Sequence, residues 1–179
     1  MLPALKLAQQ ISSDLAEFAE AKTPELIEPQ QAAESRLSPD DELLVEYDRR
    51  ILDPDLRAAT RTRFVSKHYA DAVEAGVKAL NELVRRRTGR TEDGDELMTA
   101  VFSPKGALLR INSLRSKSDL SAQRGHMLLC QGVVGAWRNP RAHTLTDDSP
   151  ARALMMLELV DDLLQITKKA TRTRRPKGP

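Results

Sequence analysis

The feature that most constrains the fold is the spacing of apolar residues, which recur at steps of three and four along most of the chain. Such spacing places apolar side chains on one face of an α-helix. Signals of strands are nearly absent, because aromatic residues are few and Asn-Gly or Asp-Gly turns rarely separate alternating apolar runs. The sequence therefore predicts an all-α protein organised as a helical bundle.

Capping residues and prolines mark where the bundle helices begin. Asp53-Pro54 and Ser149-Pro150 combine a capping side chain with a proline in the first turn, and Gly89 is a typical helix stop. Ser118 and Asp119 are expected to cap a third helix, in which Gly132 and Gly135 leave room for close backbone approach. The expected helices span residues 54–88, about 95–102, 118–138 and 150–170.

The sequence also predicts three regions along the chain. Residues 1–52 form an N-terminal helical extension for dimer contact, partner contact or regulation, residues 53–170 form the bundle domain, and residues 171–179 form a basic disordered tail. Charge supports a division near residue 50. Residues 1–50 hold 5 basic and 11 acidic side chains, net −6, whereas the remainder holds 23 and 15, net +8. The second part is therefore the candidate for a polyanionic partner, and the acidic first part is a candidate to restrain it.

Composition excludes several classes of protein. No apolar run approaches the roughly 20 residues that cross a bilayer, and the N-terminus lacks the pattern of a secretion signal, so we expect a cytoplasmic protein without membrane contact. Cys130 is the only cysteine, which rules out an intrachain disulfide, and three histidines make a Cys/His metal cluster hard to assemble. We therefore expect no metal and no cofactor.

The segment RNPRAH, residues 138–143, is the candidate for chemistry. Pro140 is expected to push Asn139 out of the α region, so that the helix ends near Arg138 and a new turn carries His143. Arginine is a permanent cation suited to phosphate oxygens, and histidine suits proton transfer near neutrality. Together they match the cleavage of RNA by its own 2′-hydroxyl, which needs a base, an acid and a cation. The alternative is an ordinary helix end whose basic residues suit the helix dipole.

Other polar residues have simpler interpretations. His126 and His68 are expected to be packed or half-exposed helix residues, Cys130 a small core residue, and the acidic DGDE segment after residue 92 a turn and helix cap. Trp137 is expected in the bundle rather than stacked on a base. A basic strip near one helix end is either solvated surface or a guide for RNA; it comprises Lys67, Arg85, Arg86, Arg87 and Arg90.

Three blocks of sequence carry a resemblance to a known superfamily: HYADAVEAGVKALNELVRRRTG (68–89), DGDELMTAVFS (93–103) and RGHMLLCQGVVGAWRNPRAH (124–143). Their order, together with Arg138, Asn139 and His143, resembles the HEPN superfamily, and in particular its Ymh-like bacterial branch of undefined role. The resemblance covers residues 51 to about 170. It implies a HEPN-like helical bundle but says nothing about the first 50 residues or the tail.

The resemblance implies a metal-independent endoribonuclease, acting in phage defence, in a toxin–antitoxin pair or in RNA processing. Two protomers of such enzymes bring their motifs together, so a homodimer is expected, with an antitoxin or other regulatory protein as a possible partner. His143 would be the general base or acid, Arg138 the phosphate clamp and Asn139 an orienting donor. Arg141, Arg124 and Lys67 are the candidate RNA contacts, although a solvated loop arginine explains Arg141 equally well. The alternative function is a non-catalytic module that binds RNA, a nucleotide or a protein.

Overall fold

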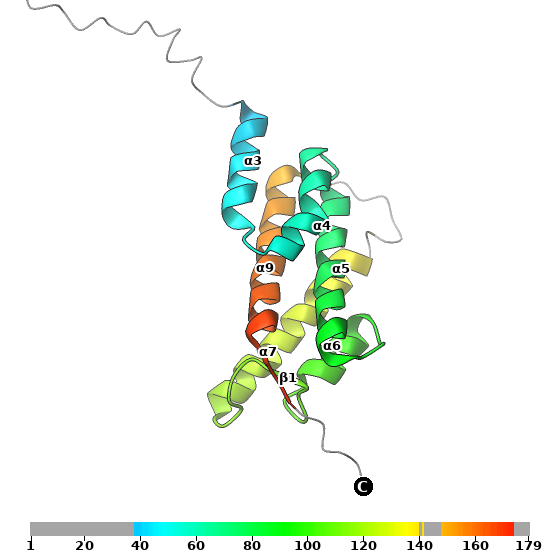
Figure 1. Ribbon diagram of the computed structural model, residues 1–179, viewed down its shortest axis with the longest axis vertical. Coiled ribbons are helices and arrows are strands. Elements are labelled where there is room, and N and C mark those ends of the chain that lie inside the picture. The colour runs from blue at the N-terminus through cyan, green and yellow to red at the C-terminus, as the bar shows by residue number, and fades with distance from the viewer. Residues whose placement is uncertain (1–37, 140, 142–147, 174–179) are drawn as a thin grey trace, which may run out of the picture. The chain divides into compact units, whose positions relative to one another are not determined.

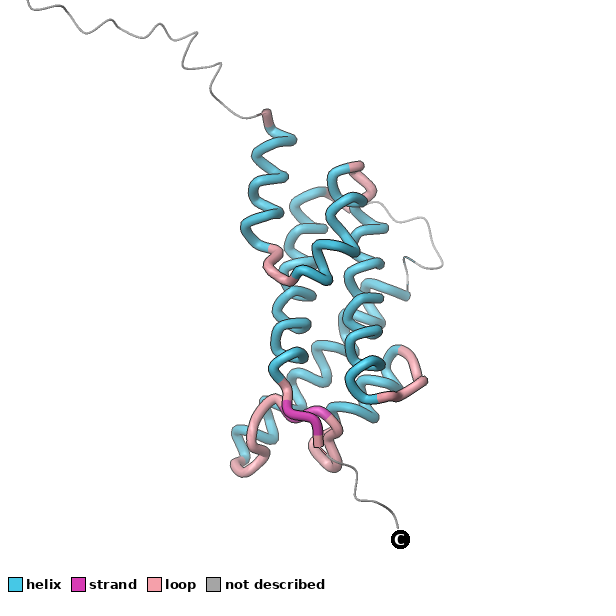
Figure 2. Tube along the Cα trace, in the orientation of Figure 1, coloured by secondary structure: helices cyan, strands magenta, loops and turns pink. Residues whose placement is uncertain are grey.

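The computed structural model describes residues 38–139, 141 and 148–173 of the 179-residue chain, and the description below is restricted to them. Helices dominate this part of the chain, so the predicted all-α class is confirmed (Figures 1 and 2). The helices are α3 (Pro39–Arg50), α4 (Pro54–Val65), α5 (Tyr69–Thr88), α6 (Gly94–Phe102), α7 (Lys117–Val133), the π-helical turn η1 (Val134–Arg138) and α9 (Pro150–Lys169).

The helix predicted over residues 54–88 is in fact two helices, and this prediction was wrong. The chain reverses at Ser66–His68, where Lys67 has a left-handed backbone conformation with φ +62°. Neither glycine nor proline marks this turn, so local sequence gives no warning of it. The turn is held by Phe64, whose ring lies 4.7 Å from that of Tyr47 and 5.1 Å, edge to face, from that of Tyr69. As a result, α4 and α5 run side by side in opposite directions (Figure 1).

Helix α5 lies at the centre of the bundle and packs against α4, α6, α9 and η1. Its apolar face is buried over its whole length, including Val73, Val77 and Leu80. Gly76 permits the closest approach, because a Cβ atom there would lie 2.9 Å from Leu157 Cδ2 of α9. The helix then ends at Gly89, which adopts a left-handed conformation with φ +72° as the sequence predicts.

The N-terminal boundary of the bundle precedes the position predicted from sequence. The compact unit begins at Pro39, not at residue 53, because α3 contributes to the core. Tyr47 and Ile51 are fully buried, and the Tyr47 hydroxyl is hydrogen-bonded to Thr60 Oγ1 at 2.6 Å. A truncation that tests the N-terminal segment must therefore keep the chain from Pro39 onward. Residues 1–37 lie outside the described residues.

The predicted helix starts at Pro54 and Pro150 are confirmed. Asp53 accepts hydrogen bonds from the backbone of Asp55 and Leu56, and Ser149 accepts one from Arg152. Helix α7 begins slightly before the predicted position. Its capping side chain is Ser116, which accepts from the Asp119 backbone N–H, whereas Ser118 and Asp119 were the predicted caps.

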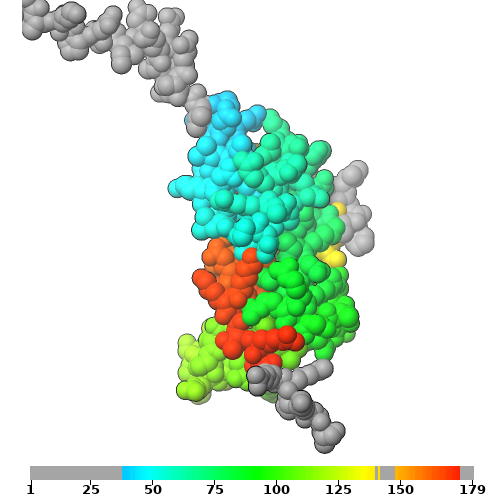
Figure 3. All heavy atoms as spheres, in the orientation of Figure 1, coloured from blue at the N-terminus to red at the C-terminus, as the bar shows by residue number. Residues whose placement is uncertain are grey.

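The C-terminal tail begins later than expected. Residues Thr171–Arg172 form strand β2, which pairs antiparallel with β1 (Leu109–Arg110), and Thr173 donates its backbone N–H to the carbonyl of Leu108. Figure 3 shows this segment lying on the surface of the bundle. Three residues of the predicted disordered tail are therefore packed on the domain. In the described part of the chain, no helix has the length and apolarity needed to span a membrane.

Candidate functional site

The motif that contains Arg138 begins in a π-helical turn. Helix α7 changes to i→i+5 hydrogen bonding at Val134, and the Asn139 N–H donates to the Val134 carbonyl. Asn139 keeps an α conformation, with φ −62° and ψ −47°. The prediction that Pro140 forces Asn139 out of the α region was therefore wrong, because the widened turn accommodates the residue before the proline. Single π turns inside helices occur frequently at functional sites.

An ion pair fixes the Arg138 side chain. Its Nη1 atom lies 2.7 Å from Oδ2 of Asp93, the residue just before α6. The other carboxylate oxygen of Asp93 is held by Asn81 Nδ2 at 2.9 Å and Arg85 Nη2 at 3.0 Å, both from α5. Three elements distant in sequence thus meet at one carboxylate. Asp93 does not cap α6 with its side chain as predicted, because Arg138 occupies it.

The surroundings of Asp93 keep its carboxylate ionised. Partial burial disfavours the charge, but the hydrogen bond from Arg138, the Gly94 N–H and the charges of Arg138 and Arg85 together hold the pKa of Asp93 below its ordinary value. Because the carboxylate remains charged at neutral pH, it holds Arg138 in one orientation. The cluster of Arg138, Asp93, Asn81 and Arg85 is called the Arg138 cluster below.

Two polar atoms of this cluster are buried without a hydrogen-bond partner among the described residues. They are Nε of Arg138 and Oδ1 of Asn81. The first is a donor and the second an acceptor, and leaving such groups unsatisfied costs about 1–3 kcal/mol each. Nη1 of Arg138 binds Asp93 and Nε is buried, but the side chain as a whole is 23% exposed, so Arg138 still presents a cation to the groove described next.

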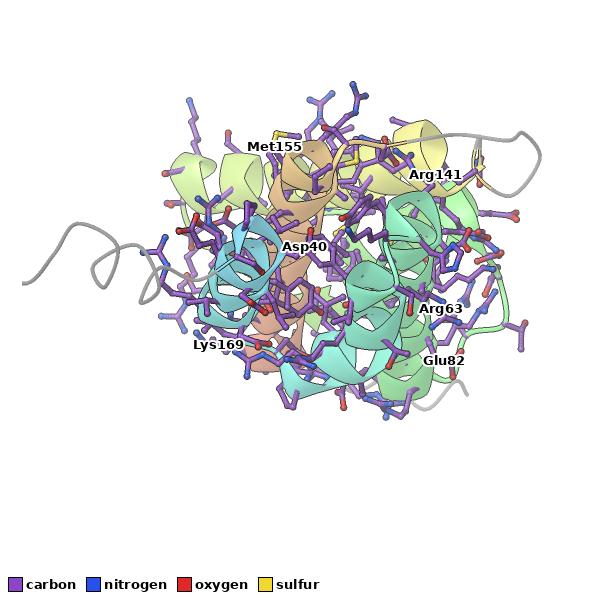
Figure 4. All side chains as sticks on the ribbon, turned by 90° about the horizontal axis from the view of Figure 1, so that it is seen from above. Asp40, Arg63, Glu82, Arg141, Met155 and Lys169 are labelled. Atoms are coloured by element: carbon purple, nitrogen blue, oxygen red, sulfur yellow. The ribbon has the colours of Figure 1, made fainter. Side chains whose placement is uncertain are left out.

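The Arg138 cluster lies at one end of an open groove of about 600 Å³. The groove follows one face of α5, and α4 contributes Ala59 and Arg63 to its wall. Figure 4 shows Arg63 and Glu82 on the same side of the α4–α5 pair. The complete lining is Ala59, Arg63, Ala75, Lys78, Ala79, Asn81, Glu82, Arg85, Asp93 and Arg138. Four cationic side chains therefore surround a surface with two carboxylates.

The environment of Arg141 differs from both predictions, an RNA contact and a solvated loop arginine. Its side chain is only 5% exposed, and its Nε donates to Asp148 Oδ2 at 2.9 Å while its Nη1 donates to the Trp137 carbonyl at 2.8 Å. Asp148 is buried to the same degree. Arg141 is therefore neither a solvated loop residue nor open to a phosphate, because a buried carboxylate and a backbone carbonyl use its donors.

The remaining predicted RNA contacts are distant from Arg138. Lys67 lies at the start of α5, about 27 Å along the helix from Arg85, and pairs with Asp40 at 2.7 Å. Arg124 is exposed near the middle of α7, about 21 Å from Arg138 along the helix rise. Lys67 and Arg124 therefore do not form one surface with Arg138.

The predicted basic strip is also divided. Arg87 donates to the carbonyls of Thr167, Lys168 and Ala170 and thereby closes the end of α9. Arg90 pairs with Glu92, and Arg86 lies 3.7 Å from Asp55. Each of these arginines therefore has its own acceptor, and they do not form one free cationic surface.

The histidines differ in what the structure shows of them. His143 lies outside the described residues, so its predicted role as base or acid stays a prediction. His126 is 4% exposed and packs edge to face on Phe102, which confirms a packed helix residue. Burial lowers the pKa of His126 to about 4, so this imidazole is neutral near pH 7. Cys130 is fully buried as predicted, and burial raises the pKa of its thiol to about 12.

Asn139 and Trp137, the neighbours of Arg138 in sequence, differ in exposure. Asn139 is exposed, and its side chain forms no hydrogen bond with any residue in the described ranges, so its role as an orienting donor stays a prediction. Trp137 is half-buried and packs against the core. Among the described residues, no group of three or more Asp, Glu, His or Cys side chains is placed to hold a metal ion.

Two residues of the cluster were not predicted as site residues: Asp93, which orients Arg138, and Asn81, which holds Asp93. The sequence predicts Asp93 in a turn and helix cap and gives Asn81 no role. The available signal is the position of Asn81: a polar residue on the buried face of an amphipathic helix needs a partner. Which partner it finds depends on the packing of α5 against the start of α6.

Comparison with known proteins identifies the family of the chain. A family model described as "Protein of unknown function (Hypoth_ymh)" matches residues 50–166, about two thirds of the chain. The chain therefore belongs to this family. No curated protein and no solved structure matches the sequence. The matched range contains the whole groove and the Arg138 cluster.

Proposed function

We propose that this member of the Hypoth_ymh family is a metal-independent endoribonuclease of HEPN type, which cleaves RNA by attack of the 2′-hydroxyl at a site shared by two protomers. The observation that carries the proposal is the state of Arg138. Its guanidinium is oriented by Asp93 at 2.7 Å, and its side chain is 23% exposed and lines an open groove. A permanent cation held in one orientation beside a groove suits a phosphate in charge.

The proposed reaction gives separate roles to His143 and Arg138. His143 exchanges the proton of the attacking 2′-hydroxyl or of the leaving 5′-oxygen, because its unperturbed pKa suits transfer near neutrality. Arg138 stabilises the charge that develops on the phosphorane. Since one chain supplies a single motif histidine, a second protomer supplies the other proton-transfer group. The expected products carry a 2′,3′-cyclic phosphate and a free 5′-hydroxyl.

The surface of α7 supports pairing of two copies. Leu128 and Leu129 are 51% and 50% exposed. Gly132 and Gly135 were expected to allow close packing inside the bundle, but a Cβ atom at either of them, or at Gly125, would meet nothing in the described chain. A glycine in an exposed helix costs about 1 kcal/mol relative to alanine. An approach by a second α7 would account for both features.

The test is digestion of end-labelled RNA by the purified full-length chain in EDTA, beside His143→Ala and Arg138→Ala. The matched control is Arg115→Ala, an exposed arginine in the loop before α7. Wild type and the control should cut at the same positions and leave cyclic phosphate ends, while both motif variants lose cleavage. Absence of cleavage by wild type, or equal cleavage by His143→Ala, would reject the catalytic assignment.

The second candidate function is a non-catalytic RNA-binding module. The observation that favours it is the ion pair between Arg138 and Asp93, which partly neutralises the guanidinium. RNA binding by wild type without any cleavage, in the presence or absence of a cellular partner, would favour this function. Only the resemblance to the HEPN superfamily supports a role in phage defence or in a toxin–antitoxin pair.

A further inference from the structure

We propose that the groove along α5 holds an unpaired RNA strand, which runs from Arg138 toward Arg63 and is contacted through its phosphates by Lys78 and Arg63. This inference rests on the proposed function, because it names the form of RNA that reaches the Arg138 cluster. It also assigns binding roles to two residues outside the RNPRAH motif.

The position of the cations supports the path of the strand. Arg63 on α4 donates only to the Ala59 carbonyl of its own helix and forms no ion pair within the described ranges, so its charge is available. Lys78 is 57% exposed and lines the groove, although it also pairs at 2.6 Å with Glu74, whose side chain is 17% exposed. From Ala75 to Arg85 the groove follows α5 for about 15 Å, or about four stacked nucleotides.

The floor of the groove suits an unpaired strand. It is formed by small side chains, Ala59 of α4 and Ala75 and Ala79 of α5, so that bases or sugars can approach the helix surface. An unpaired strand offers its base edges and faces to such a surface, whereas an RNA duplex offers mainly phosphates and 2′-hydroxyls. We therefore expect contact with the bases of an unpaired strand in this groove.

An independent observation points to a ligand at the same place. Asn81 is only 2% exposed and lines the groove, and its Oδ1 has no donor among the described residues. The amide orientation is fixed, because its Nδ2 donates to Asp93 and the reverse orientation would place two acceptors together. A base amino group at the Arg138 end of the groove would satisfy this acceptor. Free phosphate or a simple anion would not.

Two residues one helical turn apart make a sharp test. Lys78 and Glu82 both line the groove on α5, and their charges are opposite. If phosphates lie along this face, Lys78→Gln weakens binding about three- to tenfold and lowers the dependence of log K on log salt by about 0.7, whereas Glu82→Gln strengthens binding about two- to threefold. Arg63→Gln should resemble Lys78→Gln. The matched controls are Lys105→Gln, Glu42→Gln and Arg115→Gln, all on exposed residues outside the groove.

The probe is a fluorescent 2′-O-methyl RNA 12-mer, which cannot be cut because the attacking hydroxyl is blocked, and the readout is anisotropy with the full chain. We expect the unpaired strand to bind more tightly than the same strand in a duplex. Opposite changes in Lys78→Gln and Glu82→Gln, with unchanged controls, support the groove. Equal affinity of all variants, tighter binding of the duplex, or binding of mononucleotides alone overturns it. Binding with this pattern but without cleavage of unmodified RNA rejects only the ribonuclease activity.

Discussion

Arg138 and Arg141 lie three residues apart, yet the structure gives them opposite environments. Arg138 lines an open groove and pairs with Asp93, whose side chain is 41% exposed, while Arg141 is buried with Asp148, whose side chain is 3% exposed. Arg141 uses its donors on a carboxylate, a backbone carbonyl and the Met156 sulfur. The Arg138 side chain is 23% exposed, against 5% for Arg141, and its buried Nε has no hydrogen-bond partner in the described chain.

The contrast teaches that the charge of a motif does not identify its functional residue. An arginine whose donors are satisfied inside the protein stabilises the fold and has little left to offer a ligand. An arginine that is oriented by one contact and partly exposed beside a groove can bind an oxyanion. The predictions below test this division, and we order them by the expected effect.

The largest effect is expected for Arg141→Ala. This substitution leaves the Asp148 carboxylate buried without its main partner, so the free energy of unfolding should fall by about 3–5 kcal/mol. Urea denaturation followed by circular dichroism measures the change. The control is Arg152→Ala, which removes a 64% exposed partner of the same carboxylate and should cost less than about 1 kcal/mol. Similar losses in the two variants would show that the buried pair is not special.

The reverse pattern is expected for Arg138→Ala. If the guanidinium stabilises the transition state, the cleavage rate should fall about 10²–10³-fold, while stability changes far less than in Arg141→Ala. Single-turnover cleavage and urea denaturation of the same preparation separate the two effects. Arg138→Lys keeps the charge but lacks the planar fork, so it should restore only part of the rate. Loss of folding in Arg138→Ala would show that Arg138, like Arg141, mainly stabilises the fold.

The next effect concerns pH and the buried His126. Its pKa is lowered from 6.5 to about 4, so between these values the unfolded chain binds a proton that the folded chain does not. Stability should therefore fall as the pH falls from about 7 toward 4, by an amount of the order of 3 kcal/mol. His126→Gln, which can still contact Thr167, should flatten the profile. A wild-type stability that stays constant from pH 7 to 5 would contradict the buried neutral imidazole.

The smallest effect is expected for Asp93→Asn. The amide keeps its size but loses the charge that orients Arg138, so kcat should fall about tenfold while RNA affinity stays equal or increases. Because the pKa of Asp93 is lowered, its contribution is present at neutral pH and is lost only as the pH falls through a value below the ordinary range of aspartate. Separate measurement of kcat and KM checks the prediction. A rise in KM alone would show that Asp93 acts in binding and not in orientation.

Much of the fold follows from local signals. Asp53-Pro54, Ser149-Pro150 and Gly89 mark helix ends because capping and left-handed geometry depend on a few adjacent residues. The reversal at Lys67 was missed because it contains neither glycine nor proline, and contacts of Phe64 with Tyr47 and Tyr69 stabilise it. The short ribbon between β1 and β2 was missed because two-residue strands carry no periodicity.

The residues of the candidate site also fall into those that the sequence indicated and those that it did not. The sequence indicated Arg138 through the residue types of RNPRAH, and His143 stays a prediction. It did not indicate Asp93 or Asn81, because their roles arise only when α5, the start of α6 and η1 meet. It also misassigned Arg141, because burial is not a property of a six-residue motif.

The sequence by itself determined the helical class, most helix ends and the identity of the arginine that we place at the site, because periodicity, capping and side-chain chemistry are local properties. The tertiary structure decided which of two neighbouring arginines is buried, which carboxylate orients the other, and that a groove along α5 leads to it. Those outcomes depend on residues as distant in sequence as Ala59 and Arg138, which only the packing of the helices brings together around one groove.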